Sequence, residues 1–324
     1  ESAMEYVRQL QSVPAEGPER LEFFQQYFEH DDPLLAQDSY DEFARAPYSV
    51  IVELGPKLPR EKLLRWIEDH EVGPTHRRLY LTLLGVCGKP GDVDMLERLL
   101  NFDRQLIDPG VLTVVGAMGA VGNTLGVGVL DELVRAEEQR KKQSLDALIA
   151  CFLKLKGPEG LPLVNRLFLA NPQVEYTHLH AALMALRFHG EEADVLPRSD
   201  LLKSMRLALD HPDFADQVVP DLARWEDWEV MPRLVTMFKD ATSDSWIRQP
   251  VVSYLLVAAE EEGKVGADAQ AALNELETID KETVERARSN AAFSLLALGK
   301  SRAKDAGADA SDPPADSPAP GVSE

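Results

Sequence analysis

Histidines are the residues of this 324-residue chain whose spacing first suggests metal chemistry. His70 and Glu71 precede His76, which invites comparison with the zinc-protease helix motif. That motif needs two histidines one helical turn apart, so that both lie on one face of a helix. Here the histidines are six residues apart and Gly73-Pro74 lies between them. The metal interpretation therefore fails at this place.

A second histidine pair, His178 and His180, is two residues apart. On a helix such side chains point to different sides, so residues 176–178 are better interpreted as a helix start. A metal pair here is the less favoured alternative. His189 precedes Gly190 and is predicted to lie at a helix C-terminus, where a partly protonated ring would interact favourably with the helix dipole.

The two cysteines, Cys87 and Cys151, are predicted to stay unpaired. A disulfide needs Cα atoms within about 7 Å. The cysteines fall in predicted hairpins two units apart, and such helices should be separated by about twice the usual packing distance of about 8 to 10 Å. Cys151 also shares its place in the repeat with Leu83, Ala117 and Ala185, so packing of a fairly small apolar side chain explains it. We predict no catalytic residue, no metal site and no cofactor.

Two tryptophans, Trp225 and Trp228, flank acidic residues in the stretch RWEDWE at 224–229. They could form the edge of a binding site, because amphipathic aromatic residues dominate interaction hot spots. The alternative, which we favour, is that each ring fills a space between adjacent units, since large aromatic side chains are mostly buried. Both tryptophans are kept as candidate partner-binding residues.

Helices must position all of these residues, because apolar side chains recur with a period of 34 residues. Residues 141–170 hold one whole unit, with two helical apolar stripes on either side of Gly157-Pro158. Four columns stay apolar in four successive copies: Leu84, Met118, Phe152 and Leu186; Leu81, Val115, Ile149 and Leu183; Val93, Val127, Leu161 and Val195; and Leu99, Leu133, Leu167 and Leu201. Repeats of this length are typical of stacked helical hairpins that bury one continuous core.

Glycines keep the same phase in the predicted turns, at Gly88, Gly122, Gly157 and Gly190. Each is predicted to end a helix in the left-handed conformation, which glycine adopts at little cost. The repeat length also fits tetratricopeptide repeats, but their Trp, Leu-Gly and Tyr pattern is absent. The sequence therefore predicts an all-α fold, a right-handed α-solenoid (superhelix) of HEAT-like helical hairpins.

Three regions follow from the pattern. Residues 1–16 are predicted to form a lead helix that caps the first unit, and residues 17–299 the HEAT-like repeat solenoid. Residues 300–324 are rich in Ala, Asp, Pro and Ser and cannot bury enough apolar surface to fold, which predicts a disordered tail or tether. The start at Glu1, with no methionine and no signal-peptide pattern, is expected of an excised or processed segment.

Charged side chains on the predicted second helices suggest a partner-binding row. One column alternates in sign and predicts ion pairs between units, each worth about 0 to 1 kcal/mol if exposed: Arg98, Glu132, Arg166 and Asp200. The neighbouring column is rich in acceptors: Glu97, Asp131, Asn165 and Ser199. If the second helices line the inner curve, as in HEAT solenoids, these rows are the first candidates for contacting a partner. The ordinary alternative is a solvated helix surface.

Charge composition narrows the class of partner. Acidic residues outnumber basic ones 55 to 34, which gives a net charge of −21 and argues against nucleic acid and anionic lipid. Between Asp108 and Asp131 no residue is charged, and by length this stretch could span a membrane. Its six glycines would weaken such a helix, so we predict a buried repeat and no direct membrane insertion by this segment.

Three stretches carry a family resemblance: YDEFARAPY at 40–48, RRLYL at 77–81 and DLARWEDW at 221–228. Together they resemble a group of bacterial HEAT-like repeat proteins of unknown function, over most of residues 19–299. The resemblance implies the repeat part of an exported, cell-envelope protein, with a further domain before the repeats and a linker or membrane anchor after them. It supplies no catalytic residues, and a cytoplasmic location stays open.

The expected function is therefore a non-catalytic scaffold for protein–protein interaction, with an unknown protein or peptide as partner and no enzymatic activity. The repeat pattern and the lack of a convergent catalytic set favour it. Two alternatives stay open. One is a helical-repeat enzyme of the lyase or glycosylase type, although a glycosylase needs a basic groove for an extruded base. The other is a structural spacer for another domain.

Overall fold

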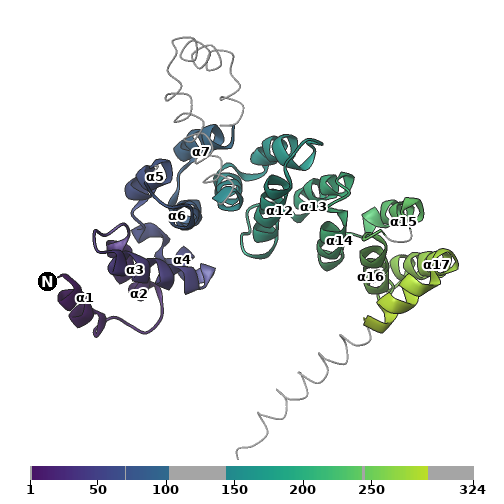
Figure 1. Ribbon diagram of the computed structural model, residues 1–324, viewed down its shortest axis with the longest axis horizontal. Coiled ribbons are helices and arrows are strands. Elements are labelled where there is room, and N and C mark those ends of the chain that lie inside the picture. Colours follow the sequence, from purple (N-terminus) through teal and green to yellow (C-terminus); the bar gives the residue numbers. More distant parts are fainter. Residues whose placement is uncertain (1, 70, 102–143, 243–244, 291–324) are drawn as a thin grey trace, which may run out of the picture. The chain divides into compact units, whose positions relative to one another are not determined.

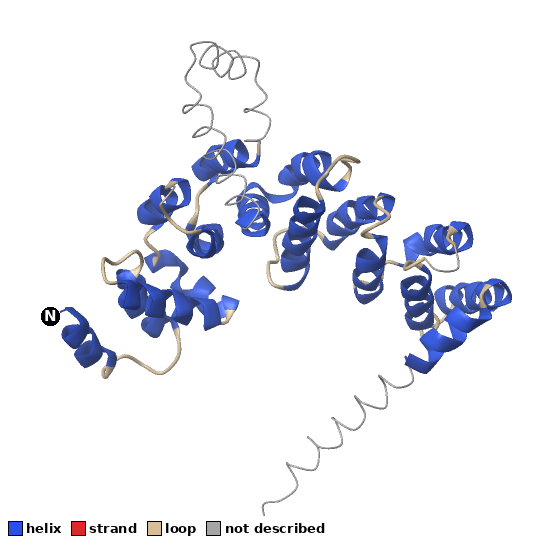
Figure 2. Ribbon diagram, viewed as in Figure 1, coloured by secondary structure: helices blue, strands red, loops and turns tan. Residues whose placement is uncertain are grey.

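The computed structural model describes residues 2–69, 71–101, 144–242 and 245–290. These residues form helices joined by loops, with no β-strand among them (Figures 1 and 2). The predicted all-α fold is confirmed for this part of the chain. The chain divides into two compact parts, residues 1–211 (unit 1) and residues 212–324 (unit 2), which are described separately.

Unit 1 begins with five helices: α1 (Ser2–Leu10), α2 (Pro18–Phe24), α3 (Pro33–Arg45), α4 (Tyr48–Leu54) and α5 (Arg60–Glu68). The local sequence explains where α3 starts, because the Asp32 side chain accepts a hydrogen bond from the Leu34 amide at 3.0 Å and Pro33 occupies the first turn. The Tyr6 ring joins α1 to α2, stacking 5.6 Å from Phe23. The lead helix thus covers the first hairpin.

The rest of unit 1 repeats a pattern of a longer first helix and a shorter second helix. The elements are α6 (Pro74–Cys87) and α7 (Val93–Leu100), a helix at residues 144–156 followed by α11 (Leu161–Val164), and α12 (Tyr176–Glu191) with α13 (Arg198–Leu207). A π-helical turn, Asn165–Leu169, extends α11. In Figure 1, α6 and α12 lie in one layer and α5 and α7 in the other.

The apolar columns of the first helices are almost completely buried. They are Leu81 and Leu84, Ile149 and Phe152, and Leu183 and Leu186. Equivalent side chains of successive hairpins therefore share one core, as predicted, while Val115 and Met118 lie outside the described residues. On the second helices Val93, Leu161 and Leu201 are buried, whereas Leu99 and Leu167 are half-buried, and Val195 is half-buried in the turn before α13.

The spacing between the cysteine-bearing helices was predicted wrongly. The helix at residues 144–156 packs directly on α6: a Cβ added at Gly85 would lie 3.7 Å from the Cα of Cys151. Arg77 also donates a hydrogen bond to Ser144 Oγ at 3.1 Å. The helices of Cys87 and Cys151 are thus neighbours rather than two units apart. Both cysteines are nevertheless free, as predicted.

Only one of the described repeat glycines has the predicted left-handed conformation. Gly157 follows the helix at residues 144–156 with a φ of +71°. Gly88 has a φ of −67°, and its lack of a Cβ matters for space, because a Cβ there would lie 2.5 Å from the Leu84 carbonyl oxygen. Gly190 lies within α12. The prediction is therefore wrong for Gly88 and Gly190, and Gly122 lies outside the described residues.

Unit 2 continues the hairpin pattern with α14 (Ala215–Arg224), α15 (Met231–Asp240), α16 (Arg248–Ala258) and α17 (Lys264–Ile279). A further helix occupies residues 281–290. The first helices α14 and α16 pack side by side, and α17 packs on α15 and α16.

Each unit contains an arginine–aspartate clamp between equivalent helices of adjacent hairpins. In unit 1, Arg60 at the start of α5 donates from Nε to Asp92, just before α7, at 2.9 Å. In unit 2, Arg248 at the start of α16 donates to Asp280 at 2.9 Å. Asp280 in turn accepts the Thr283 amide at 3.0 Å and so caps the helix at residues 281–290. Each clamp fixes the register of one hairpin on the next across 32 residues.

The electrostatics of the clamp favour charged aspartates. Burial alone would raise the pKa of Asp280, but the hydrogen bonds from Thr283 and Arg248 outweigh burial and lower it. Burial likewise acts to raise the pKa of Asp92, and the hydrogen bonds from Arg60 and the Lys89 amide again give a net lowering. Each carboxylate is therefore stabilised as an anion by an arginine of another helix and by a backbone amide close to it in sequence.

Candidate functional site

The predicted partner-binding row lies on the second helices, but its members do not pair as expected. Glu97 is half-buried and Arg98 is exposed on α7, where Arg98 approaches Glu68 of α5 at 3.8 Å. Asn165 is half-buried and Arg166 exposed on the π-helical turn.

Asp200 pairs at 2.9 Å with Lys203 on its own helix, and not with Arg166, among the described ion pairs. The predicted rung from Arg166 to Asp200 is therefore wrong, because a basic residue one turn away offers a nearer partner. Asp131 and Glu132, the row's other candidate residues, lie outside the described residues.

The inner side of unit 1 is formed by first helices. The rings of Tyr48 on α4 and Phe188 on α12 meet edge-on, with centroids 5.0 Å apart. In chain order, α6 and the helix at residues 144–156 come between α4 and α12. The layer of first helices must therefore curve for α4 and α12 to touch. α4, α6 and α12 lie on the same side of unit 1 in Figure 1. The condition on which the charged row was chosen, that second helices line the inner curve, is not met in this unit.

Both candidate tryptophans fill space inside unit 2. Trp225 is only 8% exposed. Trp228 is half-buried, and its ring lies edge-on to Tyr254 at 5.3 Å. The Tyr254 hydroxyl donates to the Asp227 carbonyl, which ties α16 to the turn that carries both rings. This arrangement is the favoured packing interpretation and leaves little tryptophan surface for a partner.

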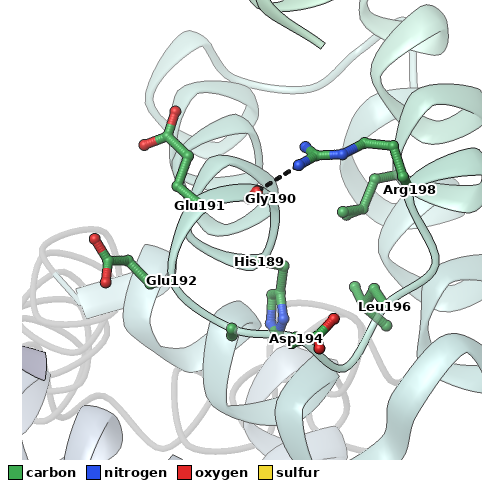
Figure 3. Close-up of a pocket in the computed structure, with 9 residues that line it drawn as sticks. His189, Gly190, Glu191, Glu192, Asp194, Leu196 and Arg198 are labelled. Carbon is green, nitrogen blue, oxygen red and sulfur yellow. Dashed lines mark hydrogen bonds between the residues drawn. The ribbon is translucent and has the colours of Figure 1, made fainter. Parts of the chain in front are cut away.

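His189 differs from its predicted role. The side chain is 3% exposed, and its Nε2 lies 2.9 Å from the Ala150 carbonyl oxygen of the neighbouring first helix. Burial lowers the pKa of His189 to about 4, so the ring is neutral at physiological pH. The cation at the end of α12 is instead Arg198, which donates to the Gly190 carbonyl at 2.8 Å (Figure 3).

A cleft of about 370 Å³ surrounds this end of α12 (Figure 3). Glu191, Glu192 and Asp194 line it, but their carboxylates point in different directions in Figure 3 rather than toward one point. In the described ranges no cluster of three or more His, Cys, Asp and Glu side chains is arranged to hold a metal ion. The cleft is therefore an acidic surface without a built site.

A second cleft of about 400 Å³ runs along the first helices of unit 1 and is here named the first-helix groove. Three helices line it with Arg78, Asp146, Tyr176, Thr177, His180, Ala181 and Met184. Arg78 of α6 and Asp146 form an ion pair across its edge. On α12, Tyr176 is 54% exposed and Met184 is 37% exposed.

The chemistry of the first-helix groove suits binding rather than catalysis. Tyr176 and His180 stack with ring planes 13° apart, one helical turn from each other. Arg78 and Asp146 neutralise each other, so the groove offers apolar surface beside one polar, charge-balanced edge. Tyrosine and arginine are enriched at interaction hot spots, and methionine adapts its shape to different partners.

Unit 2 has a smaller and more apolar cleft of about 280 Å³, here named the proline pocket. α14 contributes Pro220, Ala223 and Arg224, and α16 contributes Pro250, Tyr254 and Val257. Like the first-helix groove, it lies between neighbouring first helices. Both sites were missed in the sequence, although the apolar residues Tyr176 and Val257 outside the buried stripes were an available signal.

Comparisons with known proteins leave the family open. No family model matches the chain, and no curated protein matches it. A solved structure of human deoxyhypusine hydroxylase in complex with glycerol is similar at 14% identity, covering 86% of this chain and 85% of that one, with a TM-score of 0.32. A likeness this distant carries no argument about family or activity.

Among the described residues, no helix is both long enough and apolar enough to cross a membrane. The uncharged stretch between Asp108 and Asp131, for which a span was the alternative, lies outside the described residues. Its prediction as a buried repeat therefore stays a prediction.

Proposed function

We propose that this protein is a non-catalytic helical-repeat module that binds a segment of another protein in the first-helix groove of unit 1. The exposure of Tyr176 and Met184 beside the Arg78–Asp146 ion pair carries the proposal. These two apolar side chains are on the solvent side of α12, where they make no contribution to the shared core. Such side chains are typical of residues that a partner covers.

The groove defines the kind of segment that would fit. An aromatic or aliphatic side chain would lie between Tyr176 and Met184, which are separated by two turns of α12. Hydrogen-bonding groups of the same segment would face His180 and the Arg78–Asp146 pair at the edge. A groove of this size buries a few side chains, so we expect a short helical or extended segment rather than a large flat interface.

Several features favour this function over the alternatives. A glycosylase would need a basic groove, whereas Arg78 is neutralised by Asp146 and the whole chain has a net charge of −21. A lyase would need a convergent acid–base pair, and the groove's His180 has only the paired Asp146 as an acidic companion along its lining. An exported, cell-envelope location is part of the proposal through the family resemblance alone. The spacer role predicts no binding in the groove.

Photo-cross-linking followed by affinity measurement tests the proposal. p-Benzoylphenylalanine in place of Met184 should cross-link one recurrent protein in the native host, which is then purified. Its affinity should fall about 30-fold for Tyr176→Ala, as expected for a hot-spot aromatic residue. Ile279→Ala, which removes an exposed apolar side chain of α17 in unit 2, is the matched control and should leave the affinity unchanged.

Two results would contradict the proposed function. One is an unchanged affinity of Tyr176→Ala for every cross-linked protein. The other is the absence of any recurrent cross-link from position 184, which would favour the spacer role.

A further inference from the structure

The proline pocket of unit 2 has an unusual lining for a helical surface. Pro220 lies inside α14, and Pro250 lies in the first turn of α16. Proline has no backbone N–H, and inside a helix it breaks one hydrogen bond at substantial cost. Pro220 is exposed at the pocket and is not part of the core, so its ring contributes apolar surface to the cleft.

The pocket is rigid at its base and charged at its rim. Tyr254 is almost completely buried, its hydroxyl is fixed on the Asp227 carbonyl, and Trp228 packs edge-on against its ring. At the rim Arg224 has an exposed side chain that approaches the buried Asp221 at 3.6 Å. Trp246, in the turn before α16, is 85% exposed but does not line the pocket.

We propose that the proline pocket binds the chain's own proline-rich segment, residues 312–320, with the sequence DPPADSPAP. Proline-rich segments bind to apolar surfaces lined by aromatic residues, because their restricted backbone loses little entropy on binding. The four prolines of the segment match the apolar wall formed by Pro220, Pro250 and Val257. Its two aspartates complement Arg224 at the rim.

The length of the chain permits this contact within one molecule. The described helix ends at residue 290, and 22 residues separate it from Pro313. A chain of this length spans at most about 75 Å, whereas α16 itself is only about 16 Å long. The helix at residues 281–290 is held in unit 2 through the Arg248–Asp280 clamp, so the segment starts from the unit that contains the pocket. Attachment to the same chain raises the effective concentration of the segment to about the millimolar range.

Photo-cross-linking of the full chain tests the proposal directly. p-Benzoylphenylalanine in place of Val257, which lines the pocket and is partly exposed, is irradiated and the products are mapped by mass spectrometry. The expected product joins position 257 to residues 312–320 within a monomer. The matched control places the same photo-reactive residue at exposed Tyr176 of unit 1, where no cross-link to residues 312–320 is expected.

Substitutions confined to the proline-rich segment avoid any effect on the helical fold. P313A/P314A/P318A/P320A should lower the cross-link yield about tenfold, because it removes the matched rings. D312K/D316K should lower the yield about two- to fivefold, as expected for exposed charge pairs. No cross-link to residues 312–320, an unchanged yield with the proline variant, or a product with twice the chain mass would each overturn the proposal. The last result would show binding between two copies.

Discussion

Unit 1 and unit 2 each use their own first helices, and these present different surfaces. The first-helix groove of unit 1 combines Tyr176 and Met184 with the Arg78–Asp146 ion pair, whereas the proline pocket of unit 2 is lined mainly by apolar atoms. Buried aliphatic side chains contribute to the core of both units, such as Leu183 in unit 1 and Leu255 in unit 2. The difference teaches that the outward positions of the first helices, and not the repeat framework, define what each unit can bind.

The two units also differ in how firmly their clamps are buried. The Arg248 side chain is 10% exposed and its partner Asp280 is 14% exposed. Arg60 is more accessible at 20%, although its partner Asp92 is almost completely buried. Removing one partner of a buried ion pair leaves the other charge unsatisfied, so burial sets the cost of breaking each clamp.

The largest expected effect is therefore in the clamp of unit 1. Arg60→Ala should lower the free energy of unfolding of unit 1 by about 3 to 4 kcal/mol, because Asp92 loses its charged partner while its side chain is only 5% exposed. Arg248→Ala should cost unit 2 less, about 2 kcal/mol, because Asp280 is 14% exposed and keeps its hydrogen bonds from Thr283. Hydrogen exchange followed by mass spectrometry measures each unit separately. Equal losses in the two units would contradict the argument from burial.

Lowering the pH should also destabilise the two units to different extents, because every histidine lies in unit 1. Burial holds the pKa of His189 at about 4 in the folded state, below its usual 6.5. Between these values the unfolded chain binds a proton that the folded chain does not, so stability falls as pH falls. The loss for unit 1 should approach about 3 kcal/mol at pH 4.

The control for this titration is His189→Gln, which can still donate to the Ala150 carbonyl but does not titrate. Its unit 1 should show a flatter profile between pH 6.5 and 4 than the original chain. Unit 2 carries no histidine and should be unaffected over most of this range, until its carboxylates begin to bind protons. Identical profiles for the two proteins would show that folding does not lower the pKa of His189.

A smaller change in free energy is expected from substitutions of exposed aromatic residues in the two units. Tyr176→Ala should weaken partner binding by about 2 kcal/mol, and Trp246→Ala, which removes an exposed aromatic ring of unit 2 outside both proposed sites, should leave it unchanged. Both side chains are exposed, so neither substitution should alter the free energy of unfolding by more than about 0.5 kcal/mol. Isothermal titration with the purified partner measures the first effect and urea unfolding the second. Loss of binding in both variants would contradict the assignment of partner binding to the first-helix groove alone.

The sequence predicts the buried framework well, because a period of 34 residues requires equivalent positions to share an environment. Leu84, Phe152 and Leu186 are buried as this argument demands. The start of α3 is explained by the local preferences of Asp32 and Pro33 rather than by the period. These features depend on nearest neighbours along one helix or between adjacent helices.

Other features depend on how helices meet, which periodicity does not describe. Leu84 and Phe152 are two periods of 34 residues apart, so the period predicts one whole repeat between their helices. Yet α6, which carries Leu84, and the helix at residues 144–156, which carries Phe152, are in contact. The inner position of the first helices follows from the Tyr48–Phe188 contact, which joins residues 140 positions apart. The candidate row at Glu97 and Asn165 was selected on the opposite assumption, and the exposed face of α12 was therefore overlooked.

The smallest predicted effect compares two glycines with a positive φ in different units. Gly157 has a φ of +71° in unit 1 and Gly263 a φ of +74° in unit 2, and neither has an atom within 4 Å of an added Cβ. Alanine at Gly157 should therefore cost about 1 kcal/mol from backbone strain alone. The cost at Gly263 should be at least as large, because its ψ of −137° is close to a region that essentially only glycine adopts. Gly91→Ala, which also meets open space but has no positive φ, should change stability little. An added Cβ meets open space at both positions. A larger loss of unfolding free energy for Gly157→Ala than for Gly263→Ala, measured by hydrogen exchange, would therefore show that the turn after residues 144–156 stabilises unit 1 more than its local conformation requires.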